Sequence, residues 1–111
     1  MLLNLDPTLG AEKNKTRPCL VLENGNHSKL PLIIVVPITD AAGKEKKRIF
    51  VSIPHPSNTG LSKKSVIDPY QIRSVSKTRV LKKLGYVDSP VLDQVKSRIA
   101  LILDIGNEHI T

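Results

Sequence analysis

Five consecutive apolar residues, Leu32-Ile33-Ile34-Val35-Val36, place the strongest constraint on the fold of this chain. Most of them are β-branched, which favours an extended backbone, and the run is apolar on both faces of a strand. A strand of this kind must be covered on both faces by other parts of the protein. The run therefore predicts a central strand in a sheet.

Short extended segments on both sides of this run predict a mostly β domain. They are separated by turn and loop signals, such as Asp6-Pro7 and the stretch 54–60, which has no periodicity. Residues 47–53 alternate between polar and apolar side chains, as in a half-buried strand. The predicted strands are residues 2–5, 18–23, 32–36, 47–53, 65–67, 71–75 and 80–87.

The last predicted element is a C-terminal α-helix. Ser89 suits its N-cap and Pro90 its first helical position, and Gly106 stands where a C-terminal cap belongs. Together with the strands, this helix predicts a mostly β fold, a small barrel-like sheet with one helix, in a single domain over residues 1–111. Apolar residues at helical spacing form a stripe along the helix: Val91, Leu92, Val95, Ile99, Ile102, Leu103 and Ile105.

Length and composition limit the class of protein. A chain of 111 residues is about one domain, large enough to bury a core without disulfides, and its one cysteine cannot form an intrachain bridge. No run of about twenty apolar residues is present that could cross a membrane. No charged segment precedes an apolar stretch and a cleavage site, so a cytoplasmic protein is expected.

The net charge of +7 is concentrated in the middle of the chain. Residues 41–88 carry eleven Lys or Arg against three Asp or Glu, while residues 1–40 carry four of each and residues 89–111 carry two against three. A basic surface of this kind attracts polyanions such as nucleic acid. The alternative is a lysine-rich surface that serves solubility.

Neither a metal site nor a cofactor loop is evident in the sequence. The three histidines, His27, His55 and His109, are isolated from one another and from Cys19, so no zinc spacing exists. No glycine-rich phosphate loop and no Ser-His-Asp order are present. Cys19 lies in a predicted strand and is expected to be a small buried hydrophobe rather than a nucleophile. A site made of side chains alone, without metal or cofactor, is therefore expected.

The N-terminal segment predicts a β-hairpin loop that carries one arginine. An extended stretch leads into the polar, glycine-containing residues 6–12, and the chain leaves this loop through Arg17-Pro18 into the apolar residues 19–22. Proline fixes the backbone at the exit of the loop. The arrangement therefore places Arg17 at the rim of a rigid scaffold.

Three segments of the chain, in order, resemble the MazF/PemK/Kid endoribonuclease toxins of bacterial toxin-antitoxin pairs. The family patterns are L-D-P-x-x-G-x-E followed by R-P, then P-I-T, then S-V-x followed by D-Q-I-R. The resemblance implies an SH3-like small barrel of the CcdB/MazF toxin type with a C-terminal α-helix. The matching segments are Leu5-Asp6-Pro7-Thr8-Leu9-Gly10-Ala11-Glu12 with Arg17-Pro18, then Val36-Pro37-Ile38-Thr39, then Ser65-Val66-Ile67 with Gln71-Ile72-Arg73-Ser74.

The resemblance implies that Arg17 and Thr39 are catalytic, with Glu12 at the family's acidic loop position. RNA can be cut without a metal because its 2′-hydroxyl is an internal nucleophile held beside the phosphate. A guanidinium stays charged and reaches two phosphate oxygens, and a threonine hydroxyl adds one hydrogen bond. Glu12 either orients Arg17 or accepts the proton. The alternatives are a surface salt bridge of Arg17 with Glu12 or Asp6, and a capping role for Thr39.

The same resemblance implies an RNA-binding wall formed by Ser65, Gln71 and Arg73. Gln71 and Arg73 are predicted to alternate on one strand face, where a glutamine can contact a base edge and an arginine a phosphate. Lys47 and Lys64 lie on predicted loops that flank this wall. The alternative for the segment is the ordinary polarity of an exposed strand.

As a whole, the resemblance implies a homodimeric endoribonuclease that cuts single-stranded mRNA and leaves a 2′,3′-cyclic phosphate and a 5′-hydroxyl. Its partner is an acidic MazE-like antitoxin, which suits the positive charge of the chain. Two positions depart from the family: Met1 falls inside the first strand, and Tyr70 replaces an acidic or polar residue. The alternatives are a CcdB-like toxin that binds gyrase without nuclease activity and an inactive nucleic-acid-binding relative.

Overall fold

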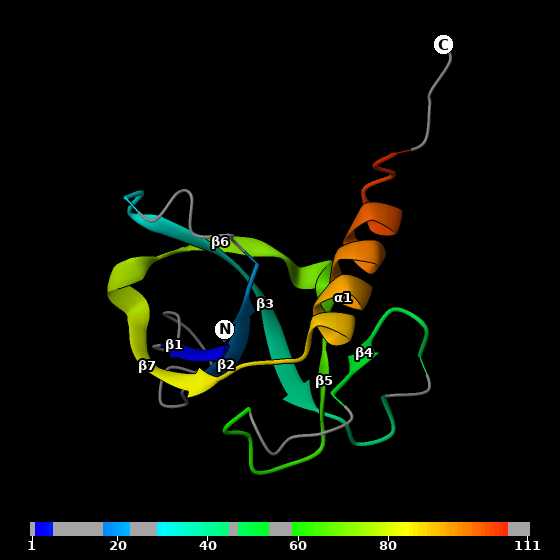
Figure 1. Ribbon diagram of the computed structural model, residues 1–111, viewed down its shortest axis with the longest axis horizontal. Coiled ribbons are helices and arrows are strands. Elements are labelled where there is room, and N and C mark those ends of the chain that lie inside the picture. Colours follow the sequence, from blue (N-terminus) through cyan, green and yellow to red (C-terminus); the bar gives the residue numbers. More distant parts are fainter. Residues whose placement is uncertain (1, 6–16, 23–28, 45–46, 54–58, 107–111) are drawn as a thin grey trace.

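The computed structural model of the chain describes residues 2–5, 17–22, 29–44, 47–53 and 59–106. Within these ranges, seven strands form one sheet and a single α-helix follows them (Figure 1). Two short 3-10 helices, η3 and η4, connect the later strands. The elements are β1 (Leu2–Leu5), β2 (Arg17–Val21), β3 (Leu32–Asp40), β4 (Val51–Ser52), β5 (Ser65–Ile67), η3 (Pro69–Gln71), β6 (Arg73–Ser76), η4 (Lys77–Arg79), β7 (Val80–Gly85) and α1 (Ser89–Ile102).

Strand β3 is the centre of the sheet, as the apolar run predicted, and it extends further to Asp40. It pairs antiparallel with β2 along one edge, where Cys19 lies opposite Pro37. Along its other edge it pairs first with β6 and then with β5, where Thr39 lies opposite Val66. The strand order is β4-β5-β3-β2-β1-β7, with β6 attached to β3. One long strand therefore pairs with three of the six other strands in the described ranges.

The sheet curls but does not close into a barrel. Strand β7 pairs with β1, while β6 pairs with β3, and no ladder joins β6 to β7 among the described residues. The helix η4 lies between these two strands, and the Ser76 hydroxyl accepts a hydrogen bond from the Thr78 amide there. The chain therefore rounds a corner in Figure 1 instead of forming a hairpin. A mostly β fold with a C-terminal helix is confirmed, with an open sheet.

The two faces of the sheet bury two separate apolar cores. Cys19 and Leu20 are neighbours in β2, so their side chains point to opposite faces, and both are buried. The face of Leu20 packs against α1, and the face of Cys19 lines the inside of the curl. The helix-side core contains Leu2, Leu20, Val36, Ile38, Val51, Ile53, Ile67, Val91 and Val95, and the inner core contains Cys19, Ile33, Val35 and Val75.

Two predicted strands begin later than expected because turns use the backbone hydrogen bonds of their first residues. In the predicted strand 47–53, only Val51–Ser52 is extended, because the Phe50 amide donates to the Lys47 carbonyl oxygen at 3.2 Å. In the predicted strand 71–75, Gln71 belongs to η3, and the strand begins at Arg73. The expectation that Gln71 and Arg73 alternate on one strand face is therefore wrong.

The helix α1 lies where the sequence predicted it, although its ends differ. Its N-cap is Asp88, whose side chain makes no capping hydrogen bond, rather than Ser89. At the other end, Asp104 takes the first left-handed conformation, with φ of 59°, ahead of Gly106 at 89°. No helix in the described part of the chain is both long and apolar enough to span a membrane.

Candidate functional site

Arg17 and Thr39 lie next to each other where β2 begins and β3 ends. Cys19 is opposite Pro37, so continuing the antiparallel register by two residues brings Arg17 opposite Thr39, on the same face of the sheet. Both side chains are half-buried. Because Thr39 lies inside β3, the alternative that it caps a turn or helix is wrong. The pair stands at the junction of two cavities that both residues line.

The first cavity, of about 390 Å³, opens between this pair and the loop that precedes β5. Ser65 is buried in its wall, and its hydroxyl donates to the Lys63 carbonyl oxygen at 2.9 Å. The Lys63 ammonium lies 3.9 Å from the Asp40 carboxylate, an exposed ion pair of little energetic weight. The described residues lining this cavity are Arg17, Pro18, Ile38, Thr39, Asp40, Leu61, Ser62, Lys63 and Ser65.

The second cavity, of about 240 Å³, lies between the same pair and η3. The amide of Gln71 and the carboxylate of Asp68 meet in its wall, with Gln71 Nε2 donating to Asp68 Oδ2 at 2.7 Å. Phe50 brings an aromatic ring and Lys44 a second positive charge. The described residues lining this cavity are Arg17, Pro37, Ile38, Thr39, Lys44, Phe50, Asp68 and Gln71.

Four of the predicted site residues gather around these two cavities, and three others do not. Arg17 and Thr39 line both cavities, Ser65 lines the first and Gln71 the second. Glu12 lies outside the described residues. The described residues that line neither cavity include Lys47 in a turn, Lys64 ahead of β5 and Arg73 on β6, and all three are exposed.

Sequence reasoning missed Asp68, Lys44 and Phe50 in the second cavity. Asp68 had a usable signal, because an aspartate directly before a proline is typical of the N-cap of a short helix. For Lys44 the signal was its place in a basic stretch of the sequence, close to Lys47, which was chosen instead. Phe50 had none, because it lies beside a turn that only the folded chain brings against the end of β3. In the first cavity, Lys63 is the sequence neighbour of Lys64, which was the lysine predicted to flank the site.

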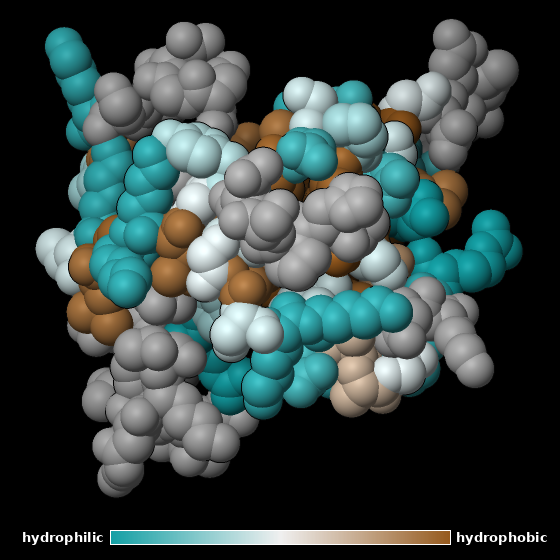
Figure 2. Space-filling model, turned by 60° about the horizontal axis from the view of Figure 1, so that its bottom comes forward, coloured by the Kyte–Doolittle hydropathy of each residue, from teal (hydrophilic) through white to brown (hydrophobic). Residues whose placement is uncertain are grey.

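The two cavities form a surface suited to a chain of phosphates. Arg17, Lys44 and Lys63 supply positive charge at their walls, while Asp40 is paired with Lys63 and Asp68 is hydrogen-bonded to Gln71. Figure 2, which brings the lower edge of Figure 1 forward, shows long hydrophilic side chains across this face with apolar patches between them. A phosphate at the junction can meet a guanidinium fork and a hydroxyl, with a neighbouring nucleotide in each cavity.

Clusters of metal ligands do not occur in the described ranges: no three His, Cys, Asp or Glu side chains converge there. The histidines considered in the sequence, His27, His55 and His109, lie outside those ranges. Cys19 is buried in the inner core, as predicted for a small hydrophobe.

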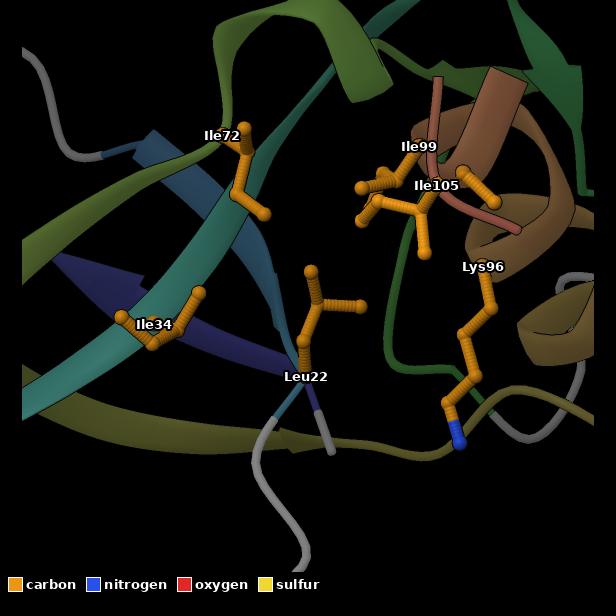
Figure 3. Close-up of a pocket in the computed structure, with 7 residues that line it drawn as sticks. Leu22, Ile34, Ile72, Lys96, Ile99 and Ile105 are labelled. Atoms are coloured by element: carbon orange, nitrogen blue, oxygen red, sulfur yellow. The ribbon is translucent and has the colours of Figure 1, made fainter. Parts of the chain in front are cut away.

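A third, apolar groove of about 400 Å³ lies between the sheet and the C-terminal part of α1 (Figure 3). Leu22, Ile34 and Ile72 project into it from the sheet side, and Ile99 and Ile105 face them from the helix side. Lys96 stands at its edge, and Ala100 completes the lining. Ile34 lies on the face of β3 that α1 covers further along the strand. The apolar face of the sheet therefore extends beyond the part that α1 covers.

The fold and the site together define a small, mostly β domain with a basic site of two cavities, and comparisons with known proteins give its family. A model of the PemK-like, MazF-like toxins of type II toxin-antitoxin systems matches residues 1–103. The chain therefore belongs to this family, as its motifs predicted.

Individual relatives agree with this assignment. The endoribonuclease MazF of Staphylococcus epidermidis is 32% identical over 107 residues, which cover 96% of this chain and 88% of the relative. The endoribonuclease MazF of Staphylococcus saprophyticus is 33% identical over 105 residues, covering 94% and 87%. Among solved structures, an endoribonuclease in complex with its cognate antitoxin from a mycobacterial species has the same fold, with a TM-score of 0.75, 16% identity and coverage of 96% and 94%.

Proposed function

We propose that this chain is an endoribonuclease toxin that cuts single-stranded mRNA in the cytoplasm, with Arg17 and Thr39 at the cleavage centre. One observation carries the proposal: two side chains suited to a phosphate lie opposite each other at the junction of two cavities. Membership of a toxin family whose curated relatives are endoribonucleases supports it.

In the proposed reaction, the 2′-hydroxyl oxygen attacks the adjacent phosphorus and the bond from phosphorus to the 5′ oxygen breaks. The 2′-hydroxyl loses its proton and the leaving 5′ oxygen gains one, which gives a 2′,3′-cyclic phosphate and a 5′-hydroxyl. Arg17 stabilises the charge that develops on the phosphate oxygens, and Thr39 donates one further hydrogen bond. Glu12 either orients Arg17 or accepts the proton.

The proposed RNA path passes through both cavities and continues over the basic surface around them. Ser65 contributes to the wall of the first cavity and Gln71 to that of the second. Lys47, Lys64 and Arg73 lie outside the cavities, so we assign them to more distant phosphates of the same strand. Contacts of this kind position the RNA but carry little sequence information.

An RNA digest in EDTA tests this proposal directly. Long single-stranded RNA is expected to be cut at specific sites with an unchanged rate in EDTA, because the nucleophile belongs to the RNA and needs no metal. The products, resolved by mass, should carry the cyclic phosphate. Intact RNA at every salt concentration would contradict the proposal. Binding without cutting would point to the inactive relative, and gyrase-dependent DNA breaks without RNA loss would point to a CcdB-like toxin.

An acidic MazE-like antitoxin is proposed as the inhibitor of this surface. The excess of positive charge lies in residues 41–88, which supply Lys44 and Lys63 to the cavities. An acidic segment that covers the cavities neutralises this charge and excludes RNA at the same time. The complex of a related endoribonuclease with its antitoxin supports such a partner.

A homodimer is proposed through the apolar groove beside α1. The groove has a single charged lining residue among those described, Lys96, and its wall continues the helix-side core outward. Ile34 is 36% exposed and Ile105 62% exposed, in a chain that already has an apolar core on each face of its sheet. A second copy of the chain buries such a surface with matched chemistry on both sides.

Replacing Ile34 and Ile105 together by glutamate is expected to convert the dimer to a monomer, because each copy would bury two unpaired charges. Sedimentation equilibrium should show the change, and the dissociation constant should rise at least about tenfold. Leu81→Glu is the matched control, since Leu81 is 50% exposed on β7 and does not line the groove. Equal dissociation in the control, or a double variant that stays dimeric, would contradict this interface.

A further inference from the structure

Asp68 is a buried carboxylate whose two oxygens have separate tasks. It is 9% exposed, and its backbone amide donates to the Pro37 carbonyl oxygen at 3.0 Å, which fixes the residue to β3. Oδ1 accepts a hydrogen bond from the Tyr70 amide at 3.1 Å and so caps η3. Oδ2 accepts from Nε2 of Gln71 at 2.7 Å. The carboxylate thus holds one side chain of the second cavity.

This hydrogen bond fixes which end of the Gln71 amide faces Asp68. In the flipped amide, Oε1 would take the place of Nε2 and lie 2.7 Å from a carboxylate oxygen, which also accepts hydrogen bonds. Two acceptors at that distance repel each other, so the amide keeps Nε2 on Asp68 and turns Oε1 away from it. A long glutamine side chain that would otherwise rotate freely is thereby given one orientation.

We propose that Asp68 is a positioning residue for base selection, acting through the amide of Gln71. The fixed amide presents Oε1 as an acceptor to the base in the second cavity. At C6 of a purine or C4 of a pyrimidine, it therefore favours the amino group of adenine or cytosine over the carbonyl of guanine or uracil. This inference rests on the proposed function, because the base belongs to a nucleotide of the RNA cut at Arg17 and Thr39.

The other walls of the second cavity suit a nucleotide. The ring of Phe50 offers an apolar surface for the face of a base, and Arg17 and Lys44 offer positive charge for its phosphate. Tyr70, which follows Pro69 in η3, is 69% exposed and does not line the cavity. Base selection at this cavity is therefore assigned to Gln71 and Asp68 rather than to the neighbouring tyrosine.

Asp68→Asn tests the inference because it preserves the cap of η3 and reverses the orientation of the Gln71 side-chain amide. Asparagine keeps an oxygen acceptor for the Tyr70 amide, but it puts an NH₂ group opposite Gln71, which then accepts through Oε1 and turns Nε2 towards the base. Oligoribonucleotides that differ by one base at each position around the cut are compared by kcat/KM. At one position the wild type should favour adenine or cytosine (the amino bases) over guanine or uracil (the keto bases) about tenfold, and the variant should favour the keto bases.

A double-mutant cycle separates positioning from a structural role. Gln71→Ala should bring the ratio of amino to keto bases close to one, and adding Asp68→Asn should then change nothing. Tyr70→Phe, a change in the same turn that keeps the backbone amide, is the matched control and should retain the wild-type ratio. The inference would be overturned if Asp68→Asn changed the ratio of amino to keto bases equally with and without Gln71→Ala. It would also be overturned if Asp68→Asn lowered the melting temperature but left this ratio unchanged.

A second measurement keeps this inference separate from the proposed function. In the free protein, nuclear magnetic resonance should show one Gln71 side-chain NH₂ proton shifted downfield by the carboxylate, and the shift should disappear in Asp68→Asn. RNA cutting without this shift overturns the positioning role alone. If the wild type cuts no RNA, the proposed function and base selection fail together, while the resonance still shows whether Asp68 holds Gln71.

Discussion

Arg17→Ala is expected to lower the rate of RNA cleavage by about 10² to 10³-fold, with much less effect on RNA binding. Arg17 is shared by both cavities and lies opposite Thr39, so the proposed function assigns it to the phosphate that separates two nucleotides. Negative charge on that phosphate grows in the transition state, and losing one preorganised donor there has an effect of this size. Single-turnover cleavage of one oligoribonucleotide, compared with its binding constant, measures both quantities.

Three matched variants identify what Arg17 contributes. Arg17→Lys keeps the charge but loses the two-pronged geometry, so an intermediate rate is expected. Thr39→Val removes only a neutral donor and should slow cleavage less than Arg17→Ala. Lys82→Ala removes one positive charge from an exposed position on β7, outside both cavities. An equal loss in Lys82→Ala, or a folded Arg17→Ala protein within twofold of the wild-type rate, would refute the assigned role.

The parts of the fold that were predicted from the sequence depend on local patterns. The run 32–36 is β-branched and apolar on both faces, and it forms the strand that pairs with β2, β5 and β6. The apolar stripe and Pro90 similarly located α1. The Arg-Pro sequence located the start of β2, and the Pro-Ile-Thr motif singled out Thr39. The antiparallel register of β2 and β3 then explains why Arg17 and Thr39, which are far apart in the sequence, lie opposite each other.

The parts that were not predicted depend on hydrogen bonds and contacts between distant segments. The alternation in residues 47–53 suggested a longer strand, but the amides of Lys47 and Phe50 bond within a turn. The Asp68 carboxylate accepts hydrogen bonds from the backbone amide of Tyr70 and from the side-chain amide of Gln71. Gln71 therefore lies outside the strand, in the wall of the second cavity. Side-chain hydrogen bonds of this local kind compete with strand pairing, and periodicity does not reveal them.

The loop that supplies one wall of the first cavity depends on a close approach at Gly60. This residue has φ of 74°, and a Cβ placed on it would lie 2.3 Å from the carbonyl oxygen of Leu84 in β7. The preceding Thr59 is buried and accepts a hydrogen bond from the Leu61 amide at 3.1 Å. Leu61 and Lys63 then line the first cavity. The contact between Gly60 and β7 therefore connects the edge of the sheet to the site.

Gly60→Ala is expected to lower the free energy of unfolding by about 3 kcal/mol, because left-handed strain adds to a clash with rigid backbone. The melting temperature should fall by about 10 °C or more. Gly43→Ala is the matched control: its φ is 85°, but a Cβ there meets no atom within 4 Å among the described residues. Gly43→Ala introduces the left-handed strain without the clash, so its free energy of unfolding should fall by only about 1 kcal/mol. Equal losses in denaturant unfolding of the two variants would mean that the close approach to Leu84 does not form in solution.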